Sequence, residues 1–376
     1  MRLVATTKAA LSSSTRTRLF YTPHTLRRIP RPHTTMSSTP NSRPSSSSST
    51  VSPSGSKPKV IFPISEIPPN PLGEGRYIRS AAALIIGDEI LNGKTLDRNS
   101  HFFARYCFEH GIELKRVEVV ADNVDEIIEA SRRMVKNYDF VITSGGIGPT
   151  HDDITYESLA KSFNQSLVHH DETLRRMAEM SKHRKWMGDQ NEQQRAARDR
   201  MALFPDKAEV IFVGEDIWVP VIRLEGKLCI FPGIPALFQK MLTSLTPFLP
   251  LPPKSERPLR IQVFTERAES MIAPYLTSLQ QRLKPHGIQV GSYPILYKGV
   301  FVSLIGRDLK QEGDADGERR VWLADVAKEV EQEVGGRVVS EEEVAAHKKD
   351  SISAETKLKE EGEVPNGEGQ GTKAKF

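Results

Sequence analysis

The chain has 376 residues, of which 38% are hydrophobic and 27% are charged, and its formal net charge is +4. This length allows two or three domains, and this composition is typical of a globular protein with polar tails. No apolar run approaches the roughly 18 residues that a membrane-spanning helix needs, so we expect no membrane as a partner.

The positive charge comes from the N-terminal end. Residues 1–60 contain ten Lys or Arg and no Asp or Glu, and the remainder carries 42 basic and 48 acidic residues. A net charge of about −6 over the remainder gives no global basic face for nucleic acid. Residues 254–340 contain neither a G-x-x-G loop nor a basic-aromatic patch for RNA. We therefore expect no nucleic acid as a partner. Cys107 and Cys229 have no partner motif and are expected to be buried thiols.

The two ends of the chain have polar, biased compositions. Residues 1–32 are rich in Arg, Ser and Thr and lack acids, which predicts a transit peptide and the mitochondrial matrix as the location. A disordered basic tail without a targeting role is the alternative. Met36 could serve as a second start and give a cytosolic form. We assign residues 1–58 to the transit peptide and a disordered linker, and residues 346–376 to a disordered tail.

A first domain is predicted over residues 77–250, with structure beginning near Tyr77. Strand patterns alternate with helix patterns in this range. The expected strands are 81–87, 114–120 and 138–144, and the expected helices are 97–110, 124–137 and 153–163. Residues 228–242 are expected to repeat the scheme as a strand, a Pro-Gly turn and a helix. This alternation predicts an α/β fold, a three-layer and mostly parallel sheet covered by helices on both faces.

A smaller α+β domain is predicted over residues 256–340, after the proline-rich segment 248–258. The expected strands are 259–265, 288–292, 299–306 and a short final one, and the expected helices are 269–284 and 320–333.

The segment VITSGGIGPTHDDIT (141–155) places a glycine-rich turn directly after a strand. Ligands of open parallel sheets bind beyond the carboxyl ends of the strands, and glycines let a ligand approach the backbone. The turn is therefore a possible phosphate cradle, although a plain loop is the alternative. It matches neither the G-x-G-x-x-G fingerprint nor a P-loop.

Carboxylates follow both strand ends of this kind. Asp88 and Glu89 come after Gly87, and Asp152 and Asp153 come after the glycine turn. Such a group beside a phosphate would require a cation, for which Mg²⁺ or another divalent cation is the oxygen-seeking choice. The alternative is that these aspartates only cap turns and helices.

Five segments together are similar to the molybdopterin-binding (MoCF, MoaB/Mog) domain family. They are GDEILNG (87–93), Asn99, ADN (121–123), TSGGIGPTHDDIT (143–155) and FPGIP (231–235). The pattern most resembles the competence/damage-inducible protein family and the N-terminal domain of eukaryotic FAD synthase. RAESMIAP (267–274) and GSYP (291–294) extend the resemblance into the smaller domain. VGEDIWVPVIR (213–223) departs from the bacterial pattern and resembles the eukaryotic branch.

The resemblance implies roles for individual residues. Asp88, with Asp152 or Asp153, would hold the metal and its water and act in catalysis. The residues implied to bind substrate are Gly87, Asn99, Ser144, Gly145, Gly146, Gly148, Thr150, Thr155, Pro232, Gly233 and Pro235, with Phe231 and Ile234 on the opposite rim. For Asn99 and Thr155, a helix start and a closed helix turn are the alternatives.

The implied function is that of a metal-dependent dinucleotide pyrophosphatase, which cleaves FAD or ADP-ribose and releases FMN and AMP from FAD. The alternatives are molybdopterin binding or adenylylation in molybdenum cofactor synthesis, and a non-catalytic nucleotide-binding protein. The sequence shows no second nucleotide loop of an adenylyltransferase, so we do not expect FAD synthesis. The expected partners are a small dinucleotide or pterin and further copies of the chain, as a dimer or trimer.

Overall fold

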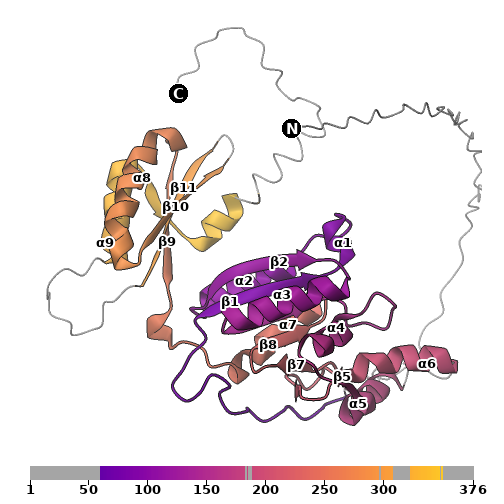
Figure 1. Ribbon diagram of the computed structural model, residues 1–376. Helices are drawn as coiled ribbons and strands as arrows, with labels where there is room; N and C mark the ends of the chain where they lie inside the picture. The colour runs from indigo at the N-terminus through magenta and orange to yellow at the C-terminus, as the bar shows by residue number, and fades with distance from the viewer. Residues whose placement is uncertain are drawn as a thin grey trace, which may run out of the picture. The chain divides into compact units, whose positions relative to one another are not determined.

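The computed structural model describes residues 60–182, 184, 189–295, 298–307, 322–347 and 349 (Figure 1). The predicted transit peptide and linker, and nearly all of the predicted tail, lie outside these ranges. Within them, no helix combines the length and the apolar composition that crossing a membrane would require.

The first domain is built on a mixed sheet. In the described ranges its strands are β1 (Ser80–Ile86), β2 (Glu113–Val120), β3 (Phe140–Ser144), β6 (Glu209–Ile211), β7 (Val221–Leu224) and β8 (Leu228–Phe231). Their order is β2-β1-β3-β8-β7-β6. The first four are mutually parallel, and β7 is antiparallel to both β8 and β6. The predicted mostly parallel sheet is confirmed.

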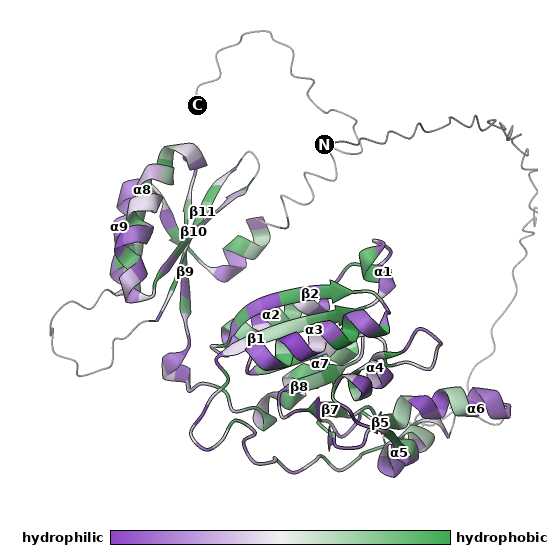
Figure 2. Cartoon of the chain, in the orientation of Figure 1, coloured by the Kyte–Doolittle hydropathy of each residue, from purple (hydrophilic) through white to green (hydrophobic). Residues whose placement is uncertain are grey.

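Helices cover both faces of this sheet and make three layers. One face packs against α2 (Asn99–Glu109) and α7 (Pro235–Leu245), and the other packs against α3 (Val124–Asn137) and α4 (Thr155–Ser162). β1 shows why, because its alternate residues face opposite sides and all are apolar after Ser80. Figure 2 shows the same separation, with green strands in the interior and purple bands on the helices.

Further elements lie between α4 and the sheet strand β6. They are β4 (Leu167–His169), α5 (Asp171–Ser181), α6 (Glu192–Asp199), a 3-10 turn (Arg200–Ala202) and β5 (Leu203–Pro205). β4 and β5 form a separate antiparallel pair. None of these elements was predicted from the sequence. The remaining short elements are α1 (Asp88–Leu91) and the 3-10 turns Thr246–Phe248, Lys254–Glu256 and Lys284–His286.

The chain joins the first domain earlier than the predicted start near Tyr77. Phe62 is only 3% exposed, and its amide donates to the carbonyl of Glu215 at 2.7 Å. The guanidinium of Arg176 lies 3.5 Å from the ring centre of Phe212 and 5.1 Å from that of Phe62. Arg176 also donates to the carbonyl of Pro63 at 2.9 Å. Residues 60–65 are therefore part of the packed structure.

The smaller domain has the predicted α+β composition. Its strands and longer helices are β9 (Leu259–Thr265), α8 (Glu269–Leu283), β10 (Gln289–Ile295), β11 (Gly299–Gly306), α9 (Leu323–Val334) and β12 (Arg337–Val339). Residues 341–347 are also helical, so the predicted disordered tail begins too early by at least two residues. The sheet order is β10-β11-β9-β12, and every pairing is antiparallel. This is the split βαβ arrangement, in which two helices cover one face of the sheet. Leu279 and Val330 of these helices pack there against Val263 and Val302.

Candidate functional site

The candidate site lies where the parallel strands of the first domain end (Figure 1). Ile85 of β1 is paired with Ser144 of β3, and Ser144 is paired with Phe231 of β8. The turns that follow these strands therefore open on one edge of the sheet. The predicted site residues brought together there are Gly87, Asp88, Asn99, Ser144, Gly145, Gly146, Pro232, Gly233 and Pro235.

The turn after β3 can be built only from glycine at two positions. Gly145 has φ = 112°, and a Cβ atom there would lie 2.0 Å from the carbonyl oxygen of Ile86. Gly146 has φ = 65°, and its Cβ would lie 2.3 Å from Oγ1 of Thr155. Positive φ and these close approaches both exclude side chains. Gly145 is buried and its amide donates to the carbonyl of Phe231 at 3.3 Å, whereas Gly146 is half-buried, so the chain is closely packed at this strand end and carries no side chain at either position.

Thr155 shapes this turn from below. Its hydroxyl donates to the carbonyl of Gly145 at 2.9 Å, and its amide donates to the carbonyl of Gly146 at 3.0 Å. The residue is fully buried. Thr155 was predicted to bind substrate, but its hydroxyl is committed to the turn, so its role in the structure is to position Gly145 and Gly146.

Asp153 closes the second half of the loop. Its Oδ1 accepts from the amide of Gly148 at 2.6 Å, and its Oδ2 accepts from the amide of Thr150 at 2.8 Å and from the Thr150 hydroxyl. Gly148 and Thr150 were predicted to donate hydrogen bonds to phosphate, but in this structure they donate to the carboxylate of Asp153. Asp153 itself is turned into its own loop, whereas the neighbouring Asp152 is fully exposed.

Arg200 holds the same loop from outside. Its guanidinium donates to the carbonyl of Thr150 at 3.3 Å and to the carbonyl of Asp153 at 3.1 Å. Two bonds from one planar group fix the two backbone carbonyls relative to each other. Sequence reasoning missed this residue, since no local signal links position 200 to a turn some 50 positions earlier.

Asn99 joins the turns after β3 and β8. Its Nδ2 donates to Oγ of Ser144 at 2.8 Å and to the carbonyl of Gly233 at 2.9 Å. Ser144 donates in turn to the carbonyl of Pro232 at 3.3 Å. Asn99 was predicted to bind substrate, and that role stays a prediction, since the bonds of its carboxamide seen here are made to the protein. Phe231 was predicted for the rim, but it is fully buried in the core against Phe238.

Asp88 and Asp122 form the acidic side of the site. The amide of Asp88 donates to Oδ2 of Asp122 at 3.0 Å, and the amide of Asp122 donates to Oδ1 of Asp88 at 3.4 Å. Burial raises the pKa of the Asp122 carboxyl, and the charges of Asp88, Glu89 and Asp152 raise it further against the opposing effect of the Asp88 amide. Asp122 was not among the predicted site residues, although it follows the end of β2 and lies in the ADN segment.

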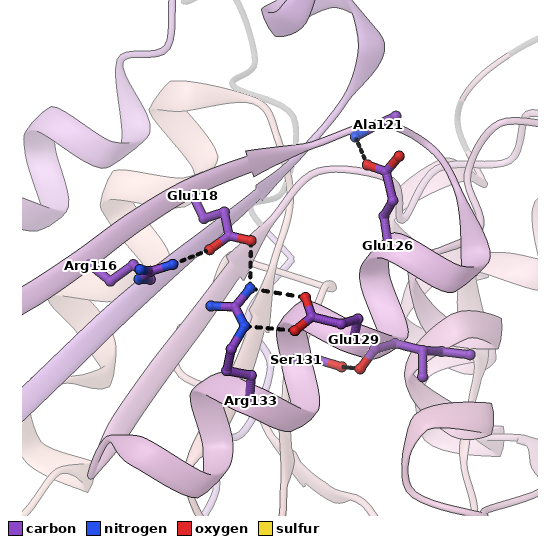
Figure 3. A network of polar contacts seen from close by, with 8 residues as sticks. Arg116, Glu118, Ala121, Glu126, Glu129, Ser131 and Arg133 are labelled. Carbon is purple, nitrogen blue, oxygen red and sulfur yellow. Dashed lines mark hydrogen bonds and ion pairs between the residues drawn. The ribbon is translucent and has the colours of Figure 1, made fainter.

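The turn that carries Asp122 is held by polar contacts of α3 (Figure 3). Glu126 accepts from the amide of Ala121 at 3.3 Å, and the Asn123 side chain caps the helix. Arg133 of α3 binds Glu118 of β2 at 2.7 Å. The position of Asp122 therefore depends on the docking of α3 against β2.

The carboxylates at this site suit a divalent cation whose remaining coordination comes from substrate phosphates and water. In the ranges that the structure describes, no group of three or more His, Cys, Asp or Glu is placed to hold a metal ion by itself. Within the same ranges, none of the ion pairs with Lys or Arg involves Asp88, Glu89, Asp122 or Asp152. Mg²⁺ commonly binds through one or two carboxylates together with phosphates and waters. This group of four carboxylates suits that mode.

A small cavity of about 60 Å³ lies between α1, α2 and the glycine turn. Its apolar walls include Ile85, Ile90 and Leu96. Its polar and charged lining residues are Glu89, Thr95, Asp97, Arg98, Asn99 and Ser144. Ligand pockets for whole small molecules are several hundred Å³, so this cavity can take only part of one.

Comparison with known proteins places this fold and site in a family. Residues 82–251 match the family model described as a probable molybdopterin binding domain. The chain is 33% identical over 235 residues to Protein PH0439 of Pyrococcus horikoshii. The aligned region covers 60% of this chain and 88% of that protein. The chain belongs to the molybdopterin-binding domain family. The resemblance drawn from the five sequence segments is thereby confirmed.

The chain is also similar to proteins named as FAD synthases and as CinA-like proteins. It is 30% identical over 236 residues to a probable FAD synthase of Caenorhabditis elegans, across 59% of this chain and 45% of that protein. It thus spans about half the length of that relative. It is 31% identical over 267 residues to a CinA-like protein of Geobacter metallireducens, across 69% of this chain and 60% of that protein. The crystal structure of CinA, a protein of unknown function from Thermoplasma acidophilum, covers 45% of this chain and 97% of its own at 29% identity and a TM-score of 0.40.

Proposed function

We propose that this family member is a metal-dependent dinucleotide pyrophosphatase that cleaves FAD or ADP-ribose. The observation that carries the proposal is the set of carboxylates Asp88, Glu89, Asp122 and Asp152, which form no ion pair with a Lys or Arg of the described residues, at the strand end that carries the glycine turn. The adjacent carboxylates of Asp88 and Asp122, with the charges of Glu89 and Asp152 acting on Asp122, favour a divalent cation, and the glycine turn with the helix start that follows it favours phosphate oxygens. In the overall reaction, water adds to one phosphorus, the bridging P–O bond breaks, and two monophosphates leave.

The residues of the chain would bind and orient the pyrophosphate. Asp88 and Asp122 would hold a divalent cation, with Glu89 and Asp152 beside them. A bound cation supplies charge neutralisation for the pyrophosphate and a more acidic water. The turn at Gly145 and Gly146, held by Thr155, would let the phosphates approach the backbone without a side chain between them. Asn99 would keep the turns after β3 and β8 at a fixed spacing.

The test is hydrolysis of FAD and of ADP-ribose by the full chain, with Mg²⁺, with Co²⁺ and with EDTA. The comparison variant is Asp88→Asn combined with Asp152→Asn, which removes two charges and little volume. Asp206→Asn, which changes an exposed aspartate beyond β5, is the matched control. We expect metal-dependent release of FMN and AMP that falls at least about 100-fold in the double variant and persists in the control.

A second candidate is molybdopterin binding or adenylylation, and the description of the matching family model favours it. Its signature would be pterin binding together with no cleavage of FAD or ADP-ribose under any of the metal conditions. That combination would overturn the pyrophosphatase proposal. Binding of flavin nucleotides without any turnover would instead favour a non-catalytic nucleotide-binding protein.

A further inference from the structure

The carboxamide of Asn99 has only one orientation that its neighbours accept. The carbonyl of Gly233 can only accept a hydrogen bond, so the atom 2.9 Å from it must be Nδ2. Ser144 donates its own hydroxyl proton to Pro232, so it accepts from Asn99 as well. The side-chain oxygen Oδ1 must therefore face the other way. It is buried, on a residue that is 5% exposed, and no donor among the described residues reaches it.

The other polar groups around this cavity are mostly acceptors too. Asp97 uses Oδ1 to accept from the amides of Asn99 at 2.9 Å and Ser100 at 3.0 Å, and its Oδ2 accepts no hydrogen bond from the part of the chain that the structure describes. Glu89 lines the same cavity. Arg98 is the lining residue with a charged donor group, and it is exposed. The cavity is therefore rich in acceptors and negative in charge.

This chemistry selects the group that can enter. A phosphate would be repelled by Glu89 and Asp97 and would leave Asn99 Oδ1 without a donor. A cavity of about 60 Å³ has room for a few water-sized groups, and not for a whole flavin, pterin or adenine ring. Two adjacent hydroxyl groups fit both the size and the need for donors.

We propose that the cavity bound by Glu89, Asp97 and Asn99 takes a vicinal diol of the sugar part of the substrate. This inference rests on the proposed function, because it assigns the sugar of the same dinucleotide whose phosphates lie at the glycine turn. The cavity shares Ser144 and Gly145 with that turn, so sugar and phosphate would occupy neighbouring positions, as they do in a nucleotide. The diol belongs either to the ribose of the adenosine half or to the ribityl chain of the flavin half.

Equilibrium binding of the reaction products tests this inference apart from catalysis, because monophosphates contain no pyrophosphate bond to cleave. The ribose arm compares AMP with 2′,3′-dideoxy-AMP, and the ribityl arm compares FMN with an analogue that lacks ribityl hydroxyls. Each pair is titrated into the full chain with Mg²⁺. We expect loss of the hydroxyls to weaken binding about 10- to 100-fold in one arm, which identifies the source of the diol.

The Asp97→Asn variant provides the protein side of the test. An Asn side-chain oxygen can still accept from the α2 amides, so the helix start should be kept while the charge is lost. We expect its preference for the hydroxylated ligand to fall at least about fivefold, whereas Glu109→Gln at the far end of α2 should keep the full preference.

The outcomes separate this inference from the proposed function. Cleavage of FAD or ADP-ribose with equal binding of hydroxylated and deoxygenated ligands in both arms would overturn the diol site and leave the pyrophosphatase in place. A clear preference without any cleavage would support the diol site and count against the pyrophosphatase. Failure of both AMP and FMN to bind would overturn the diol site.

Discussion

Asp88 and Asp122, 34 residues apart, each accept a hydrogen bond from the backbone amide of the other. The pair joins the turns after β1 and β2 and keeps two carboxylates side by side. Asp122→Asn preserves an accepting oxygen but removes one charge. We expect near wild-type thermal stability and at least about tenfold weaker Mg²⁺ binding in the presence of AMP, measured by calorimetry. Unchanged Mg²⁺ affinity would remove Asp122 from the site.

The conformation of the glycine turn predicts a specific steric effect. Gly145→Ala would place a methyl group 2.0 Å from the carbonyl of Ile86, so the turn must shift or the domain must loosen. We expect a loss of about 2 kcal/mol or more in the free energy of unfolding, together with loss of nucleotide binding. Gly93→Ala is the control, because Gly93 also has positive φ (76°) but nothing lies within 4 Å of its Cβ position. Equal effects of the two substitutions would mean that backbone strain, not the clash, decides.

Arg200 should matter for the site more than for stability. Arg200→Ala removes both bonds to the loop carbonyls, whereas an exposed side chain contributes little to folding. We expect a change in unfolding free energy of about 0.5 kcal/mol or less and a rise in KM of about tenfold. Arg195→Ala, on the exposed face of α6, should leave KM unchanged. Arg200→Lys should recover little, since one ammonium cannot reproduce the planar pair of donors.

Residues 60–65 should contribute to the stability of the first domain. Phe62 is 3% exposed beneath Arg176, while its neighbour Ile61 is 65% exposed. Phe62→Ala should lower the free energy of unfolding by about 3 kcal/mol, and Ile61→Ala should change it by about 0.5 kcal/mol or less. Urea denaturation of both variants would show the difference, and equal midpoints would mean that the N-terminal segment is not packed in solution.

The ion pairs of α5 predict a pH dependence of stability. The Arg175 guanidinium, with a smaller contribution from Arg176, lowers the pKa of Glu172 to about 2 from an ordinary value of 4.5. Because the folded-state pKa is the lower one, charged Glu172 stabilises the fold above about pH 4.5, and this contribution is lost as the pH falls toward 2. The urea midpoint of Glu172→Gln should therefore fall less than that of the wild type over this range. Glu74→Gln, an exposed carboxylate, should follow the wild type.

Much of the sheet could be predicted from local patterns. β1 and β3 are short apolar runs that end at glycine, and the family motifs lie on the turns that follow them. The contacts that decide individual roles could not be predicted in the same way. Asp152 and Asp153 are adjacent in the sequence, yet one is exposed and the other is turned into its loop. That difference depends on the path of the backbone. The bonds from Arg200 to the carbonyls of Thr150 and Asp153 come from a segment that has no periodic pattern in the sequence.

Cys107 of α2 and Cys229 of β8 are both buried in the core layer between the sheet and the α2/α7 pair, as the sequence analysis expected. Burial raises the pKa of the Cys229 thiol to about 12 and that of Cys107 further still. Thiols react as thiolates, so neither should be modified while this layer is closed. The chain thus contains two cysteines, unreactive while buried, beneath α2 and α7, the helices that begin at Asn99 and Pro235. The rate at which these thiols are alkylated would therefore measure how often that layer opens. A ligand that contacts the turns after β1, β3 and β8 at once should lower this rate.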